Sequence, residues 1–140
     1  MIKLTIQNVS SVKKTPSKKL FQTWIETALK NKSKQIDLCI RIVDENEIQQ
    51  LNNQYRDKNK PTNILTFTYE SNEKMIHGDL IVCAPIIKKE ALEQEKTEEA
   101  HWAHMIIHSC LHLLGYDHQI DKEAEVMEGL EASLLKSFGY

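Results

Sequence analysis

The sequence predicts an α+β domain in which a small mixed β-sheet packs with helices. Segments of alternating apolar and polar residues, typical of strands, are interspersed with segments of helical spacing in the order β-α-β-α-β-β-α-α-α. The chain has 140 residues without a linker or repeat, so residues 1–140 are expected to form a single domain. Its composition, 41% hydrophobic and 27% charged, excludes disordered and fibrous proteins.

The first elements alternate strand and helix. Apolar residues recur at every second position over 2–6 and again over 36–42, which predicts two strands. Between them, Thr15 and Pro16 can open a helix because proline suits a first helical turn. The apolar face of this helix continues to Leu29.

The middle of the chain predicts one helix, a loop and two strands. Asp44 and Glu47 have the spacing of a capping box, which opens a helix through Tyr55. The polar residues 56–61 end in proline and predict an exposed loop. Short apolar or β-branched strands are expected at 64–68 and 80–83.

Three helices are expected in the last part of the chain. The first covers about 84–96, and Thr97 caps the next one, which runs to Leu114. Gly115 is suited to end that helix. A last amphipathic helix is expected over about 121–138, with its apolar stripe on Val126, Leu130 and Leu134.

The sequence favours a cytoplasmic location without membrane contact. No apolar run reaches the ~18 residues of a membrane span, and the first residues lack the apolar core of a signal peptide. Cys39, Cys83 and Cys110 are widely spaced within apolar segments, so we expect reduced, buried thiols and no disulfides.

The net charge of −2 conceals an uneven distribution. Residues 1–70 carry 12 Lys and Arg against 7 Asp and Glu, whereas residues 71–140 carry 6 against 13. Such asymmetry is compatible with one face that meets a polyanion, and also with two solvated faces that have no partner.

The histidines carry the clearest chemical signal. Four of the six lie on the helix that Thr97 opens: His101, His104, His108 and His112. His108 and His112 are four residues apart, so their imidazoles project from adjacent turns, and the break at Gly115 allows His118 to reach the same point. Three neutral imidazoles on a long helix and the turn after it predict a zincin-like site for one Zn²⁺ per chain, with a fourth position open. Three histidines would also hold nickel or cobalt.

The spacing His-x-x-x-His-x-x-Gly-x-x-His is also the ligand pattern of metzincin proteases. Those enzymes need a glutamate directly after the first histidine as general base, and this chain has Ser109 there. Ser109 therefore argues against peptide hydrolysis but leaves the predicted metal site intact. His104 is a candidate for supporting a ligand from behind.

The segment after Tyr55 carries the best candidates for phosphate contact. Arg56, Lys58 and Lys60 lie on one loop, and a guanidinium can grip two phosphate oxygens at once. The alternative is a surface ion pair of Arg56 with Asp57 or Glu47. The chemistry alone leaves both readings open.

Two segments closely resemble the YbeY family of bacterial metal-dependent endoribonucleases. The residues that match its histidine signature are His108, Leu111, His112, Leu113, Gly115, Tyr116, Asp117 and His118. A second family segment corresponds to 56–67, and Gly78-Asp79-Leu80 is similar to a family strand. Three positions depart from the pattern: Ser109 replaces glycine, Asn63 replaces aspartate and Thr66 replaces serine. The missing carboxylate puts an acid–base role at position 63 in doubt.

The resemblance implies a zinc-dependent endoribonuclease specific for single-stranded RNA. It implies action in ribosomal RNA processing, at the 3′ end of small-subunit RNA, and in ribosome quality control. Single-stranded RNA, ribosomal RNA and the small ribosomal subunit would be its partners, and no DNA partner is expected. Arg56 matches the family's functional arginine, and Asp117 is the nearest carboxylate that could orient a ligand imidazole. Two alternatives remain: a metal-dependent hydrolase of a peptide or small molecule, and a non-catalytic zinc-containing ribosome-assembly factor.

Overall fold

A four-stranded mixed sheet and five helices make up the part of the chain that the computed structural model describes, residues 2–29, 34–116 and 121–140. This confirms the predicted α+β class and the predicted order of elements. The elements are β1 (Ile2–Asn8), α1 (Lys18–Leu29), β2 (Gln35–Val43), α2 (Glu45–Arg56), β3 (Ile64–Ser71), β4 (Met75–Cys83), α3 (Ala84–Glu93), α4 (Glu98–Leu113) and α5 (Asp121–Ser137).

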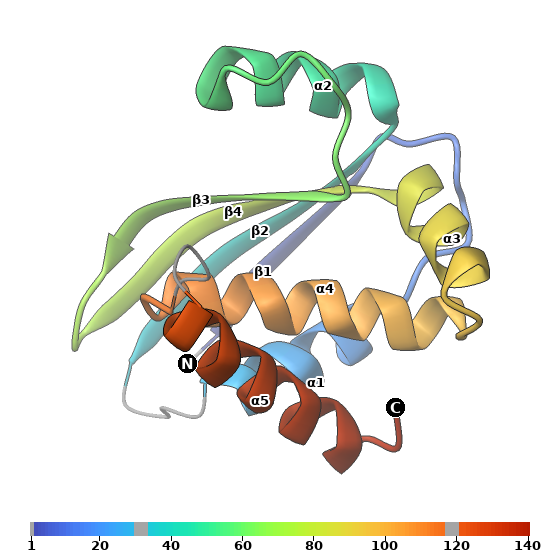
Figure 1. Ribbon diagram of the computed structural model, residues 1–140. Helices are drawn as coiled ribbons and strands as arrows, with labels where there is room; N and C mark the ends of the chain where they lie inside the picture. The colour runs from blue at the N-terminus through green and yellow to red at the C-terminus, as the bar shows by residue number, and fades with distance from the viewer. Residues whose placement is uncertain (1, 30–33, 117–120) are drawn as a thin grey trace.

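The sheet has the strand order β1-β2-β4-β3 (Figure 1). β1 pairs with β2 and β2 with β4 in parallel, whereas β3 is antiparallel to β4 and forms an edge. One face is covered by α4, with α1 and α5 packed against that helix, and α2 lies on the opposite face (Figure 1). The alternation of β4 matches this arrangement, because Leu80 and Val82 belong to the main core and Ile81 and Cys83 to a small core under α2.

Close contact between α4 and the sheet depends on Gly78 in β4. A Cβ atom there would lie 2.6 Å from the carbonyl oxygen of Phe67 and 3.0 Å from Cδ2 of Leu113. A side chain at this position would therefore push β3 or the end of α4 away. At the same end, the hydroxyl of Ser71 donates to the carbonyl of Leu113 over 2.6 Å and ties β3 to α4.

Two predicted helix starts differ from the structure. α1 begins at Lys18, after the predicted Thr15 and Pro16, because the hydroxyl of Ser17 accepts from the amide of Leu20 and caps the helix there. α2 does begin after Asp44, but the predicted capping box is not formed. The carboxylate of Asp44 accepts instead from the amide and hydroxyl of Ser11, and Glu47 pairs with Arg41.

The predicted strands at 64–68 and 80–83 are the ends of a longer hairpin. β3 and β4 continue to its turn, where Oδ1 of Asn72 accepts from the amides of Lys74 and Met75. α3 ends at Glu93, earlier than expected, and Glu95 takes a left-handed conformation with φ 54°.

The remaining expectations concern cysteines and membranes. Cys39, Cys83 and Cys110 are free thiols as predicted; Cys83 and Cys110 are buried and Cys39 is half-buried. Within the described ranges, no helix is both long and apolar enough to cross a membrane.

Candidate active site

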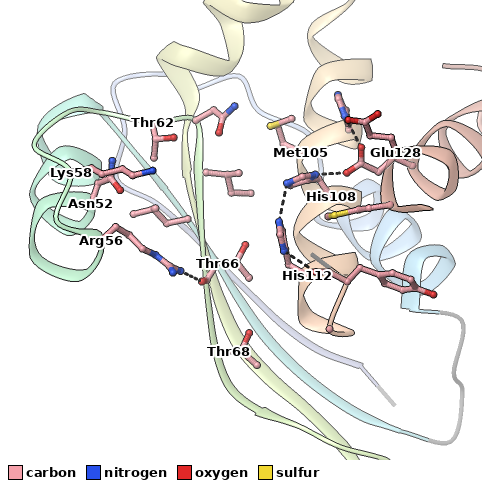
Figure 2. A pocket seen from close by; sticks show the side chains of 18 of the residues that line it. Asn52, Arg56, Lys58, Thr62, Thr66, Thr68, Met105, His108, His112 and Glu128 are labelled. Atoms are coloured by element: carbon pink, nitrogen blue, oxygen red, sulfur yellow. Dashed lines mark hydrogen bonds and ion pairs between the residues drawn. The ribbon is translucent and has the colours of Figure 1, made fainter. Parts of the chain in front are cut away.

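A pocket opens where α2, β3, α4 and α5 meet, and it collects most of the predicted site residues (Figure 2). Arg56, Lys58 and Lys60 line it from the end of α2 and the following loop, and Thr66 and Thr68 from β3. His104, His108 and His112 line it from α4, and Glu131 from α5. The structure thus brings the basic loop and the histidine helix, which are far apart in the sequence, to one cavity.

The ends of α4 are fixed as the sequence predicts. Thr97 caps the helix, its hydroxyl accepting from the amide of Ala100 over 3.1 Å. At the other end, Gly115 has φ 99°, and the amides of Gly115 and Tyr116 donate to the carbonyls of His112 and Leu111. This is a Schellman motif, which ends the helix at Leu113, directly after the predicted ligand His112.

His108 and His112 present the same ring nitrogen to a common point. Nδ1 of His112 lies 3.1 Å from the carbonyl of Tyr116, and a carbonyl can only accept, so this nitrogen carries the proton. Nδ1 of His108 donates in the same way to the carboxylate of Glu131. In a neutral ring that carries its proton on Nδ1, the lone pair is on Nε2, and the two Nε2 atoms lie 3.1 Å apart.

This separation fits a shared metal ion. Two nitrogens bound at about 2.0–2.1 Å in a tetrahedral site lie about 3.3 Å from each other. A cation between two neutral rings would bind both Nε2 lone pairs. The use of His108 and His112 as metal ligands stays a prediction, and their Nε2–Nε2 distance is compatible with it.

Glu131 lines the candidate site, and the sequence did not reveal it. It is only 6% exposed, and its second oxygen lies 3.3 Å from Nε2 of His104. Burial would raise its pKa, but the hydrogen bonds from His104 and His108 outweigh burial and hold the pKa at about 2. The sequence did contain one indication of its burial. Glu131 shares a stripe of α5 with Met127 and Leu134, and all three are buried.

Arg56 lies at the rim of the pocket, opposite the histidines (Figure 2). Asp57 ends α2 in a left-handed conformation, and the guanidinium then reaches back to β3. Its Nη2 donates to the carbonyl of Thr66 over 2.9 Å, and its centre lies 5.7 Å from the ring centroid of Phe67. Throughout the described residues, no carboxylate forms an ion pair with Arg56. The alternative pairing with Asp57 or Glu47 is therefore not seen.

The basic loop is held by side chains of α2. The buried amide of Asn52 donates to the carbonyl of Lys60 over 2.9 Å, and Gln49 bonds Asn59. Lys58 and Lys60 are both exposed along the pocket. The loop thus presents two ammonium groups beside Arg56 from a fixed backbone.

The residues that depart from the family pattern all have partners. Thr66 and Ser109 are hydrogen-bonded to each other through their hydroxyls, and Nδ2 of Asn63 lies 3.2 and 3.3 Å from the two carboxylate oxygens of Glu90.

The predicted third ligand His118 and the predicted supporting residue Asp117 lie outside the described residues. Among the residues that are described, no group of three or more His, Cys, Asp or Glu is arranged to hold a metal.

The match to known proteins covers nearly the whole chain. The family model for "Endoribonuclease YbeY" matches residues 3–139. The chain belongs to the YbeY endoribonuclease family. YbeY is a family of nucleases that acts in ribosomal RNA processing, and this places the chain among enzymes that cleave RNA.

A solved structure agrees with this assignment. The solution structure of TM1509 from Thermotoga maritima is similar to this YbeY chain at 29% sequence identity and a TM-score of 0.65. The similarity covers 94% of this chain and 87% of TM1509. The mixed sheet and its helices are thus shared over almost the full length of both proteins.

Proposed function

We propose that this chain is a zinc-dependent endoribonuclease that hydrolyses phosphodiester bonds of single-stranded RNA. The observation that carries the proposal is the pair of Nε2 atoms of His108 and His112, 3.1 Å apart, in a pocket that also contains Arg56. His118 would complete the ligand set, so that each chain holds one ion. When bound, the ion would supply Lewis-acid polarisation of a phosphate oxygen and activation of water.

The residues around the histidines suit a phosphate substrate. Arg56 keeps most of its donors available, since the structure shows Nη2 bonded to Thr66 and no carboxylate paired with the guanidinium among the described residues. It can bind two phosphate oxygens at once and stabilise the negative charge that develops during cleavage. Lys58 and Lys60 can hold the phosphates on either side of the reacting one.

The architecture of the pocket favours a single strand. An unpaired strand can bend between β3 and the loop after α2, with its phosphates along the three cations and its bases free to stack on exposed rings such as Tyr55, which is 58% exposed. Ribosomal RNA, in particular the 3′ end of small-subunit RNA in the cytoplasm, is the proposed substrate in the cell. The family assignment supports this part of the proposal.

Cleavage assays with the full-length protein test the proposal. Labelled single-stranded RNA should be cut, and a chelator or His112→Ala should abolish cutting because each removes the ion or a ligand. His77→Ala is the matched control, since His77 lies in β4 against Tyr69, away from the pocket lining. Cleavage that survives both the chelator and His112→Ala would contradict a metal-dependent reaction.

The substrate is tested separately. Duplex RNA and single-stranded DNA of the same sequence should be cut more slowly than single-stranded RNA. In cells that lack the protein, small-subunit RNA with an extended 3′ end should accumulate, and the His112→Ala protein should not restore maturation. Normal maturation in such cells would contradict the proposed cellular role.

A further inference from the structure

We propose that Glu131 is a positioning residue of the metal site, which holds His108 with Nε2 directed at the ion. The inference rests on the proposed function, because it assigns Glu131 a role toward a metal that His108 binds. Glu131 lies on α5, and none of the predicted ligands or phosphate contacts lies on that helix.

The first argument is the number of histidines that one carboxylate serves. Oε1 of Glu131 accepts from Nδ1 of His108, and Oε2 accepts from Nε2 of His104 over 3.3 Å. His104 is oriented in turn by Lys96, whose Nζ lies 3.2 Å from its Nδ1. The four side chains form one continuous hydrogen-bonded chain behind the metal-facing nitrogens.

The second argument is that each proton of this chain has a single place. An ammonium can only donate, so Nδ1 of His104 accepts and its Nε2 carries the proton toward Glu131. An ionised carboxylate can only accept, so Nδ1 of His108 must carry a proton. The direction of these hydrogen bonds therefore favours the tautomer of His108 that carries its proton on Nδ1 and can bind a metal through Nε2.

The third argument is the rigidity of the carboxylate. Met127 and Leu134, one turn before and after Glu131, are 1% and 6% exposed and pack in the main core with α4. Glu131 itself is 6% exposed, and turning its carboxylate away would break its hydrogen bonds to both histidines. Docking of α5 on α4 thus sets the orientation of His108.

A purely structural role makes a different prediction. A buried carboxylate paired with histidines often contributes little net stability, and an uncharged residue of the same shape can replace it. If Glu131 serves only packing, Glu131→Gln should leave metal affinity unchanged. If it positions His108, the variant should bind metal more weakly, because the amide loses the charge and its NH₂ group faces the N–H donor of one of the two histidines.

The experiment measures Zn²⁺ affinity of the full-length protein by competition with a chromogenic chelator. Glu131→Gln should weaken Zn²⁺ binding about 10–100-fold. Glu125→Gln, the same change at an exposed position of α5, should bind like the unmodified protein. Equal affinity of Glu131→Gln and the unmodified protein, with binding lost in His112→Ala, would overturn the role of Glu131 and leave the proposed function standing. An unmodified protein that binds no Zn²⁺ would overturn both.

A second measurement needs no variant and covers the case in which Glu131→Gln does not fold. Nitrogen-15 NMR of the metal-free protein distinguishes the two tautomers of each histidine. We expect His108 with the proton on Nδ1 and His104 with the proton on Nε2. A proton on Nε2 of His108 would overturn the inference.

Discussion

The hydroxyls of Thr66 and Ser109 are hydrogen-bonded over 3.0 Å and join β3 to α4 in the middle of the site. The carbonyl of Thr66 also accepts a hydrogen bond from Arg56, and Ser109 directly follows His108 in the sequence. The two positions depart from the family pattern, which has serine and glycine there, and the structure shows that the replacements meet. This contact therefore connects the arginine side of the pocket with the histidine side.

Removal of one hydroxyl of this pair should destabilise the protein. Thr66→Val leaves the fully buried hydroxyl of Ser109 without its partner, which costs about 1–3 kcal/mol of unfolding free energy. The double variant Thr66→Val/Ser109→Ala leaves no polar group behind and should recover much of that loss. Urea unfolding of the two single variants and the double variant measures the coupling. Strictly additive losses would contradict the contact.

Asn63 should not tolerate the aspartate that the family has at this position. Its amide lies 3.2 Å from a carboxylate oxygen of Glu90, so Asn63→Asp replaces a hydrogen bond by the repulsion of two like charges. We expect a loss of about 1–3 kcal/mol of unfolding free energy at neutral pH. The loss should shrink at acidic pH, where one of the two carboxylates is protonated.

The control for this prediction is a substitution of Glu90, the partner of Asn63. Glu90→Gln removes one charge, so Asn63→Asp made in that background should cost less than in the unmodified chain. Chemical denaturation of the four proteins gives the comparison. An equal cost in both backgrounds would show that Glu90 is not the cause.

How far the sequence predicts this site depends on the range of each interaction. The ends of α4 follow from Thr97 and Gly115, because a cap and a Schellman motif are made by neighbours in the chain. Asp44 has the same local signal, but its carboxylate is taken by Ser11, 33 residues away. No pattern among neighbouring residues in the sequence reveals a contact between segments that are far apart in the chain.

The same reasoning explains Glu131 and the start of β4. The sequence places the apolar stripe of the last helix on Val126, Leu130 and Leu134, whereas Val126 is 51% exposed and Glu131 is buried beside His108. The histidine partners that make a buried carboxylate favourable lie on another helix. The first half of β4 is similarly hidden, because His77 and Asp79 are half-buried and leave no apolar run to detect.

Protonation of His101 should destabilise the fold. This side chain is 1% exposed, and burial lowers its pKa, although the hydrogen bond to Glu90 opposes the shift. The unfolded chain therefore takes up a proton at this residue more readily than the folded protein, and stability present above about pH 6.5 is lost as the pH falls. His101→Gln cannot titrate, so the metal-free variant should lose less stability between about pH 7.5 and pH 5.5. Thermal unfolding across this range checks it, and parallel pH profiles would contradict it.

The loop lysines should govern the salt dependence of RNA binding. Each phosphate contact contributes about 0.7 to the slope of log affinity against log salt for a single strand. Lys58→Ala and Lys60→Ala should each weaken RNA binding and reduce the magnitude of the slope by nearly the contribution of one phosphate contact. Lys89→Ala is the control, because Lys89 is exposed on α3 and pairs with Glu93. Fluorescence anisotropy at several salt concentrations measures the slopes, and identical slopes for all four proteins would contradict a phosphate role.

The chain offers a matched test of Arg56, since Arg41 is its only other arginine. Arg41 is bound through Nε and Nη2 to Glu47, whereas Arg56 is held at one nitrogen by Thr66 and faces the pocket. Arg56→Lys keeps the charge but loses the planar fork, so one group can no longer hold Thr66 and a phosphate together. Turnover of single-stranded RNA should fall about 100-fold, with a much smaller change in RNA affinity. Arg41→Lys should retain normal turnover, and an Arg56→Lys enzyme as fast as this control would show that the guanidinium does not act in the reaction.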